Sequence, residues 1–199
     1  AGPAYADNFS GWSAVSRETA DVLARMPPGT RLVADNFMLG AQLAFALDRD
    51  DVAVLEHPLN AKHGRAVQLA DWGLLSAGRA DWGEAPVLLV VEDSARPLKQ
   101  RLQAYRELCE RAGALPAAQV LNVDQGRKRF LLFPLEGDES GCTLPALAWL
   151  ETPAPGARWE GGVVSGWALK PGAGVARIDV TLDGEVVAGA APALARPDV

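Results

Sequence analysis

The stretch that decides the fold is Val87-Leu88-Leu89-Val90-Val91. An unbroken aliphatic run of this length predicts a strand that a parallel sheet buries on both faces. Two more strands are expected upstream, over 30–34 and 52–55, and the segment 37–47 between them is apolar on nearly every side, which predicts a buried helix. Alternation of strands and helices predicts an α/β fold, a mostly parallel sheet with flanking helices. We expect this domain to occupy residues 1–150.

Further helices and a strand pair are expected on either side of this core. Apolar residues recur at helical spacing over 13–26 and predict a helix that ends before Pro27-Pro28. The same spacing predicts a second helix over 97–112. Downstream, the segments 120–123 and 129–133 predict a terminal antiparallel pair around the turn 124–127.

The composition changes at residues 152–156, where proline and glycine indicate a linker. No helical period follows, and Asp183-Gly184 predicts a hairpin turn. We therefore expect a smaller all-β segment over residues 151–199, which three strands leave incomplete. The predicted strands are 163–168, 175–182 and 186–188.

The overall composition excludes several classes of protein. The 199 residues are 49% hydrophobic and 22% charged, which is a globular balance. The net charge of −6 leaves no cationic surplus for phosphates, so we expect no nucleic-acid partner. No apolar run reaches the roughly 20 residues that span a bilayer, so we expect the chain itself to be soluble. It begins with Ala1 rather than Met, and we expect it to be part of a longer protein.

Polar residues follow each of the three predicted parallel strands. They are Asp35-Asn36, Glu56-His57 and Glu92-Asp93-Ser94. The carboxyl ends of parallel strands share one edge, which is where open α/β sheets bind ligands. The alternative is that these residues cap the helices that start there, and we favour capping for Asp35, Asn36, Asp93 and Ser94.

The polar loop, residues 57–65, is the strongest candidate for a ligand site. Both histidines of the chain lie in it, and a short helix is expected over 65–72. Its side chains suit an anion such as a phosphate or sugar phosphate. The alternative, equally open, is a solvated loop whose charges pair with Glu56 and Asp71. The candidate residues, with Asp35 and Asn36, are His57, Asn60, Lys62, His63 and Arg65.

Other chemistry finds little support in the sequence. It lacks dinucleotide-binding, P-loop and nucleophile-elbow motifs, and we expect no cofactor and assign no catalytic residue. Two histidines without a compact third ligand are a weak metal signal, so no metal site is expected. Cys109 lies on the apolar side of its predicted helix and is expected to be an inert buried thiol. A disulfide with Cys142 is the alternative.

Six segments between residues 8 and 136 carry a family resemblance. They are Asn8 to Trp12, Val33 to Phe37, Glu56 to Arg65, Gln68 to Trp72, Val87 to Glu92 and Gly126 to Phe130. Together they resemble the C-terminal domain of bacterial membrane glycosyltransferases of family 39, the aminoarabinose-transferase and protein-mannosyltransferase-like group. The resemblance covers about two thirds of the chain, and residues 56–65 are its most specific part. Residues 163–188 more weakly resemble the opening strands of bacterial immunoglobulin-like domains.

The resemblance implies an accessory domain at the periplasmic face of the bacterial inner membrane. Enzymes of that family move a sugar from a polyprenyl-phosphate carrier, using acidic residues in loops beside their membrane helices. This sequence contains neither those loops nor those helices, so no catalytic residue carries over. The implied partner is the membrane-embedded remainder of the same polypeptide. The alternatives are a stand-alone small sugar- or phosphate-processing enzyme, and a non-catalytic interaction module that binds through its β-rich tail.

Overall fold

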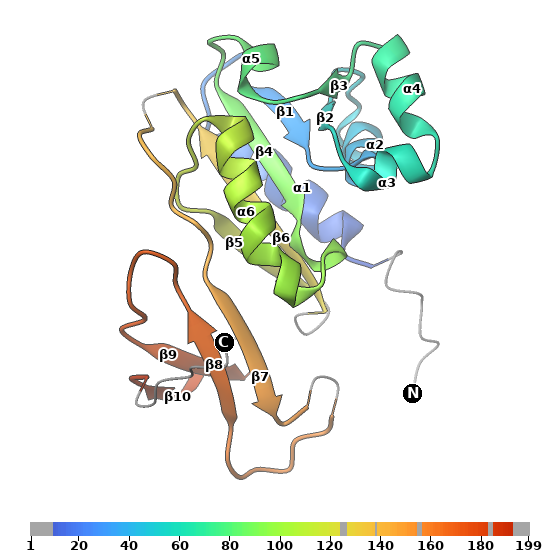
Figure 1. Cartoon of the computed structure of the whole chain (residues 1–199). Coiled ribbons are helices and arrows are strands. Elements are labelled where there is room, and N and C mark those ends of the chain that lie inside the picture. Colours follow the sequence, from blue (N-terminus) through green and yellow to red (C-terminus); the bar gives the residue numbers. More distant parts are fainter. Residues whose placement is uncertain (1–9, 124–126, 138, 155–156, 183–184, 193–199) are drawn as a thin grey trace. The chain divides into compact units, whose positions relative to one another are not determined.

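The structure is a computed structural model of the chain (Figure 1). The chain divides into two compact units, residues 1–143 and residues 144–199. Within the described part of the chain, no helix combines the length and apolar character needed to cross a membrane. The described residues are 10–123, 127–137, 139–154, 157–182 and 185–192. The predictions for Asn8 and Phe9, the turn residues 124–126, the linker residues 155–156 and the Asp183-Gly184 turn lie outside them.

The first unit is built on a six-stranded mixed sheet with the strand order β3-β2-β1-β4-β6-β5. The first four strands in this order pair in parallel, whereas β6 pairs antiparallel with both β4 and β5. The α/β class and the antiparallel pair at the end are confirmed, while the mostly parallel arrangement holds only for the β3-β2-β1-β4 half. The strands are β1 Arg31–Ala34, β2 Ala53–Leu55, β3 Leu75–Ser76, β4 Val87–Glu92, β5 Gln119–Val123 and β6 Lys128–Leu135.

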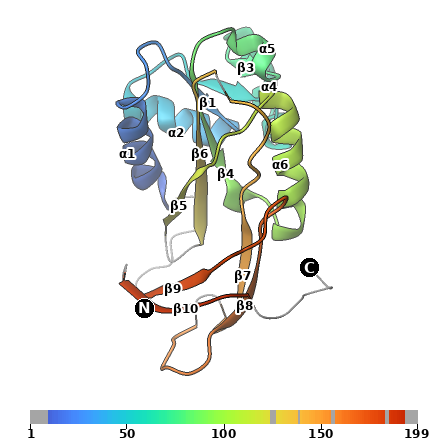
Figure 2. The same ribbon diagram turned by 90° about the vertical axis from the view of Figure 1, so that its left-hand side faces the viewer.

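Helices cover both faces of this sheet, which explains why every residue of β4 is buried. Figure 2 shows α1 (Trp12–Leu23) and α2 (Phe37–Leu47) on one face and α6 (Leu98–Ala112) on the other. The α1 and α2 side chains form one core cluster with alternate residues of the central strands. On the opposite face, α6 buries Tyr105, Leu108 and Ala112, and it ends at Gly113 in the left-handed conformation (φ 77°).

Short elements connect the parallel strands to one another, and one more follows β4. They are α3 (Pro58–Lys62), α4 (Arg65–Asp71), α5 (Arg79–Trp82) and, after β4, the 3₁₀ turn η2 (Asp93–Ala95). The helix expected over 65–72 is confirmed as α4. The polar loop is therefore helical through α3, which begins at Pro58 because proline has no N–H to leave unsatisfied in a first turn.

The second unit contains two separate antiparallel pairs. Strand β7 (Leu147–Thr152) pairs with β8 (Ser165–Leu169), and β9 (Ile178–Leu182) pairs with β10 (Glu185–Ala190). Strand β7 was not predicted. Most side chains of these strands are exposed, which is the expected state of two-stranded sheets that lack a second layer.

Candidate functional site

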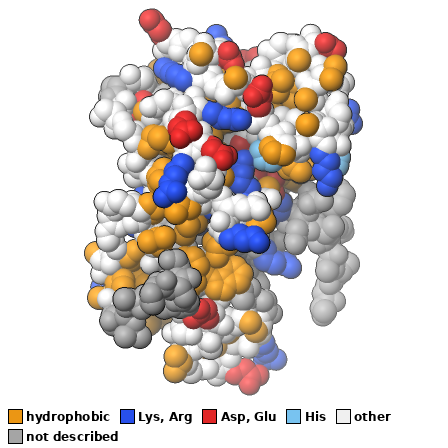
Figure 3. All heavy atoms as spheres, viewed as in Figure 1, with side chains coloured by type: hydrophobic (Ala, Val, Ile, Leu, Met, Phe, Trp, Pro, Cys, Tyr) orange, Lys and Arg blue, Asp and Glu red, His pale blue; other side chains and the backbone are white. Residues whose placement is uncertain are grey.

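A pocket of about 530 Å³ lies where the connections of the sheet diverge. Strand β1 leads into α2 on one face, and its neighbour β4 leads into α6 on the opposite face (Figure 2). Open α/β sheets bind ligands in the crevice that this divergence creates at the carboxyl ends of the strands. The pocket is lined by the ends of β1, β2 and β4, by Arg96 and Pro97, and by one side of α6 as far as Arg111. In Figure 3, pale-blue histidine and blue Lys and Arg side chains lie beside hydrophobic surface on the first unit.

Asp35, which directly follows β1, anchors the inner end of this pocket. Its side chain is 2% exposed, and its Oδ1 accepts hydrogen bonds from Asn36 Nδ2 (2.8 Å) and from the Glu92 backbone N–H (3.2 Å). Its Oδ2 pairs with Arg96 Nη1 at 2.9 Å. The capping role favoured for Asp35 is therefore wrong, because the carboxylate points across to the β4 connection and not to the start of α2.

Asn36 and Asn60 hold the surrounding backbone. Asn36 caps α2 as predicted, since its Oδ1 accepts from two backbone N–H groups of the first turn at 3.0 and 3.1 Å. Asn60 bridges two elements: its Oδ1 accepts from Phe37 N and its Nδ2 donates to Leu55 O, each at 2.9 Å. Both side chains are buried, so their part in the site is to position it.

His57 follows β2 and lines the pocket with one nitrogen already occupied. Its Nδ1 accepts from Leu59 N at 3.1 Å and so caps α3, which leaves the proton of the neutral imidazole on Nε2. Burial lowers the pKa of His57; Asp35 opposes this shift, and Arg96 and Arg111 add to it. The ring is therefore a neutral hydrogen-bond donor at pH 7.

Two cations of the pocket come from α6 and one from the short segment before it, and the sequence reasoning missed all three. Arg96, Lys99 and Arg111 all line it. Arg111 Nη1 donates to Glu56 O at 2.6 Å, which ties the end of α6 to the end of β2. The available signal was the polar stripe of α6: residues 96, 99, 100, 103, 107 and 111 recur at helical spacing.

Three of the predicted site residues in the polar loop do not join this pocket. Lys62, His63 and Arg65 are exposed. The His63 ring packs on Phe37 with 5.6 Å between ring centroids, and Arg65 Nη1 donates to Gln68 Oε1 at 3.0 Å. Of the predicted site residues, the structure brings Asp35 and His57 together in one pocket. Asn60 lines a smaller adjoining pocket, which shares His57.

The capping role expected for Asp93 and Ser94 is also wrong. Asp93 is buried and accepts from the Tyr105 hydroxyl at 2.6 Å, and it pairs with Arg101 at 3.2 Å. Burial and the Asp93 carboxylate raise the pKa of Tyr105, which keeps its hydroxyl protonated as a donor. Ser94 Oγ accepts from Arg129 N at 3.2 Å. Both side chains thus fasten β4 to α6 and β6, because the short η2 turn intervenes before the next helix.

The third buried strand-end carboxylate, Glu92, pairs with Lys128 of β6 inside the protein. Lys128 Nζ also lies 5.2 Å from the centroid of the Trp12 ring, within the range of a cation–π contact. Burial raises the pKa of Glu92, and the bond to Lys128 opposes that shift. Each of the three buried strand-end carboxylates is therefore matched by a cation from another element.

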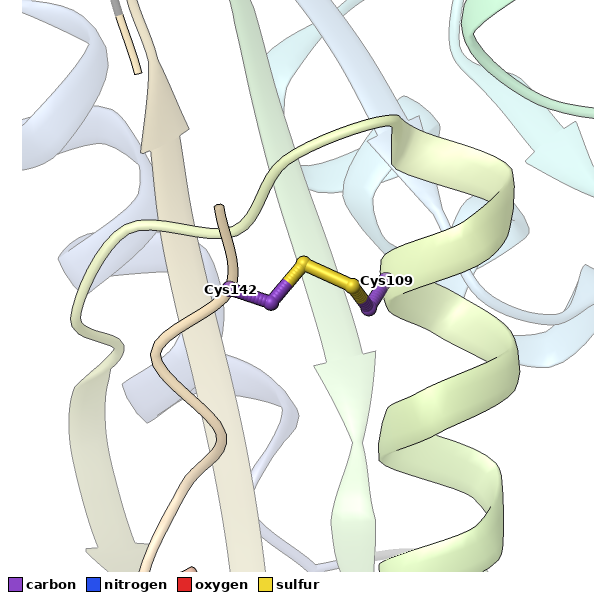
Figure 4. Close-up of a disulfide and its surroundings, with 2 residues drawn as sticks. All are labelled: Cys109 and Cys142. Carbon is purple, nitrogen blue, oxygen red and sulfur yellow. A yellow bond between two sulfur atoms is a disulfide. The ribbon is translucent and has the colours of Figure 1, made fainter. Parts of the chain in front are cut away.

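A disulfide anchors the end of α6 that carries Arg111. Cys109 of α6 is bonded to Cys142, with 6.0 Å between their Cα atoms (Figure 4). The expectation that Cys109 is a free, inert thiol is wrong. The chain after α6 returns beside it, where Leu115 N donates to Gly141 O (3.0 Å) and Thr143 N donates to Leu115 O (2.8 Å), which brings Cys142 within bonding reach.

The inner end of the pocket presents hydrogen-bond donors. The oxygens of Asp35 and the Nδ1 of His57 are occupied as acceptors, while the guanidinium and imidazole N–H groups around them are donors. Among the described residues, no group of three or more His, Cys, Asp or Glu side chains is placed to hold a metal ion. In comparisons with known proteins, no family model, no curated protein and no solved structure matches this chain.

Proposed function

We propose that this chain is an accessory domain of a membrane-embedded glycosyltransferase that moves a sugar from a polyprenyl-phosphate carrier. In this proposal it lies at the periplasmic face of the bacterial inner membrane and binds a phosphate or sugar phosphate without transferring it. The family resemblance of residues 56–65 suggests the parent enzyme. The partner is the membrane-embedded remainder of the same polypeptide.

The observation that carries the binding role is the donor-rich pocket at the crevice of the sheet. Catalysis by a stand-alone enzyme would need an acid and a base with free atoms facing a substrate. Asp35 already accepts three hydrogen bonds, and His57 has its basic nitrogen turned to Leu59. With these acceptors occupied, the inner end of the pocket presents N–H donors, which suits it to hold an anion better than to move a proton.

The disulfide supports the proposed location. Disulfides persist in oxidising compartments such as the bacterial periplasm and are rare where glutathione and thioredoxin keep thiols reduced. Cys109 and Cys142 are the two cysteines of the sequence, and they pair with each other. A domain in the periplasm would form this disulfide because the compartment itself is oxidising.

Cell fractionation tests the membrane part of the proposal. A tag inserted in the chromosomal copy of the gene should place the protein in the inner-membrane fraction. The tag should be digested by protease once the outer membrane is permeabilised. Recovery in the cytoplasmic fraction, or protection of the tag until the inner membrane is broken, would contradict the proposal.

A second candidate function is an interaction module in the β-rich unit. Trp149, Leu182 and Val187 are 47%, 51% and 51% exposed on β7, β9 and β10. Large apolar side chains exposed on strands are typical of surfaces that another protein segment covers. If so, the triple variant Trp149→Ser, Leu182→Ser, Val187→Ser should bind a hydrophobic dye much less than the full wild-type chain does. Equal dye binding would remove the support for this function.

A further inference from the structure

We infer that the pocket along α6 binds a phosphate monoester, with the phosphate between His57, Arg96 and Arg111. The inference deepens the proposed function, since it rests on the pocket being the ligand site. It does not depend on a membrane-embedded parent. It also places the anion site in this pocket and not at Lys62 and Arg65, the exposed cations of the polar loop where the sequence predicted it.

The first donor is His57, and its orientation is fixed before a ligand arrives. Because Nδ1 accepts from Leu59 N, the Nε2–H group is the one left to donate. His57 is the second residue after β2, at the carboxyl edge where the crevice opens. A neutral imidazole N–H adds a hydrogen bond to the phosphate without adding charge.

The second donor, Arg96, is held by the carboxylate behind it. The Asp35 side chain is 2% exposed and that of Arg96 is 23% exposed, so water reaches the guanidinium and not its partner. The bond to Asp35 uses Nη1, one part of a planar group that carries five N–H donors. Asp35 is itself fixed by Asn36 and Glu92 N, so the guanidinium is oriented before binding.

The third donor, Arg111, approaches from the far end of α6. Its Nη1 bond to Glu56 O positions the guanidinium next to β2, and the disulfide at Cys109 fixes this turn of the helix. Arg96 and Arg111 both lower the proton affinity of His57. Both arginines line the same pocket as the His57 ring.

The charge around His57 favours an anion. Two guanidinium groups and one carboxylate, Asp35, act on the ring, and that carboxylate is already paired with Arg96. Two other carboxylates line the pocket: Glu107, which accepts from Gln103 Nε2 at 3.1 Å, and Glu56, which is exposed to solvent. Lys99 adds a further cation to the same side of α6. Arg is the side chain best suited to phosphate because its fork of donors contacts two oxygens at once.

The shape of the pocket indicates a phosphate ester and not inorganic phosphate alone. It follows α6 from Pro97 to Arg111, about 20 Å at the helical rise of 1.5 Å per residue. Its volume of about 530 Å³ lies in the range of pockets for drug-sized ligands and exceeds what one phosphate needs. Leu55, Leu59 and Leu108 form an apolar lining that would contact the group esterified to the phosphate.

Calorimetry on the full chain tests the inference with three titrants: inorganic phosphate, glucose 1-phosphate, and vesicles that contain an isoprenyl phosphate. We expect binding of at least one phosphate ester, and the soluble and vesicle arms distinguish a sugar phosphate from a lipid headgroup. Arg111→Gln should weaken that binding about tenfold or more, which is the effect of losing a charged hydrogen bond. The matched control is Arg106→Gln, an exposed arginine of α6 outside the pocket, which should change the affinity less than about twofold.

Several outcomes would overturn the inference. One is that none of the three titrants binds. Another is that the Arg111→Gln and Arg106→Gln variants bind with equal affinity. A third is that the Lys62→Ala, Arg65→Ala variant loses binding, which would place the site at the polar loop. Thermal melting of each variant shows whether it is folded. Fractionation of the tagged protein reports on the membrane parent alone, so the two proposals fail separately.

Discussion

Removing the disulfide should cost the protein about 4 kcal/mol of unfolding free energy. Cys109 and Cys142 are 33 residues apart, and a closed loop of that length removes chain entropy worth about this much from the unfolded state. The folded state should change little, because backbone hydrogen bonds from Leu115 to Gly141 and from Thr143 to Leu115 hold the same segment. The variant for the measurement is Cys109→Ala with Cys142→Ala, which leaves no thiol to pair wrongly.

Urea unfolding of the oxidised wild type and the double variant, followed by circular dichroism, measures the difference. Wild type unfolded under reducing conditions is the control and should match the variant. A difference below about 1 kcal/mol would refute the entropy argument. Two thiols that react with a thiol reagent in the native oxidised protein would refute the bond itself.

Other predictions concern the buried Lys128–Glu92 pair, the Asn60 side chain, the titration of His57 and the boundary between the two units. Lys128→Met leaves the Glu92 carboxylate unpaired and should cost about 3 to 5 kcal/mol in urea unfolding, whereas adding Glu92→Leu should recover most of that loss. Asn60→Ala should cost about 3 kcal/mol by the same method, because two buried backbone groups lose their partner; a cost below about 1 kcal/mol would contradict this. Because burial lowers the pKa of His57 in the folded state, the unfolded chain takes up the proton first, and stability should fall as the pH drops below 6.5. His57→Asn keeps a capping oxygen and does not titrate, so its melting temperature should fall less between about pH 7.5 and pH 5.5, and equal falls would contradict the assignment. Deletion of residues 144–199 should leave the first unit cooperatively folded in a thermal melt, and loss of the transition would show that the two units fold as one.

The central elements of the sheet could be predicted because local and tertiary preferences agree there. The helix expected over 37–47 is α2, Phe37–Leu47, since Asn36 caps its start and Asp48 takes the left-handed conformation (φ 52°) that ends it. The run at 87–91 became the buried β4 because strands pair on both sides of it and helices cover both faces.

Other elements depend on pairing that the local sequence does not specify. Strand β3 has two residues, and its place is fixed by its pairing with β2. Strand β7 pairs with β8 across more than ten residues of intervening chain. Helix α3 was missed because its cap is a histidine nitrogen, which is not among the usual capping groups.

The site was predictable only at the strand ends. Asp35 and His57 follow β1 and β2, so the shared edge of parallel strands was enough to bring them together. Arg96 and Arg111 come from the α6 connection, and their place beside His57 depends on which face of the sheet that helix covers. The disulfide could not be predicted for the same reason, that it depends on the tertiary fold. Cys142 reaches Cys109 only after the chain has passed through β5 and β6.

The most direct test of the account is the position of a phosphate mimic in the protein. In crystals of the full chain soaked with tungstate, the anomalous signal of tungsten locates the bound anion. We predict a peak between the His57 ring and the guanidinium groups of Arg96 and Arg111. A peak beside Lys62 and Arg65 in place of one in the pocket would contradict the account, as would a pocket left empty at tungstate concentrations that fill sites elsewhere.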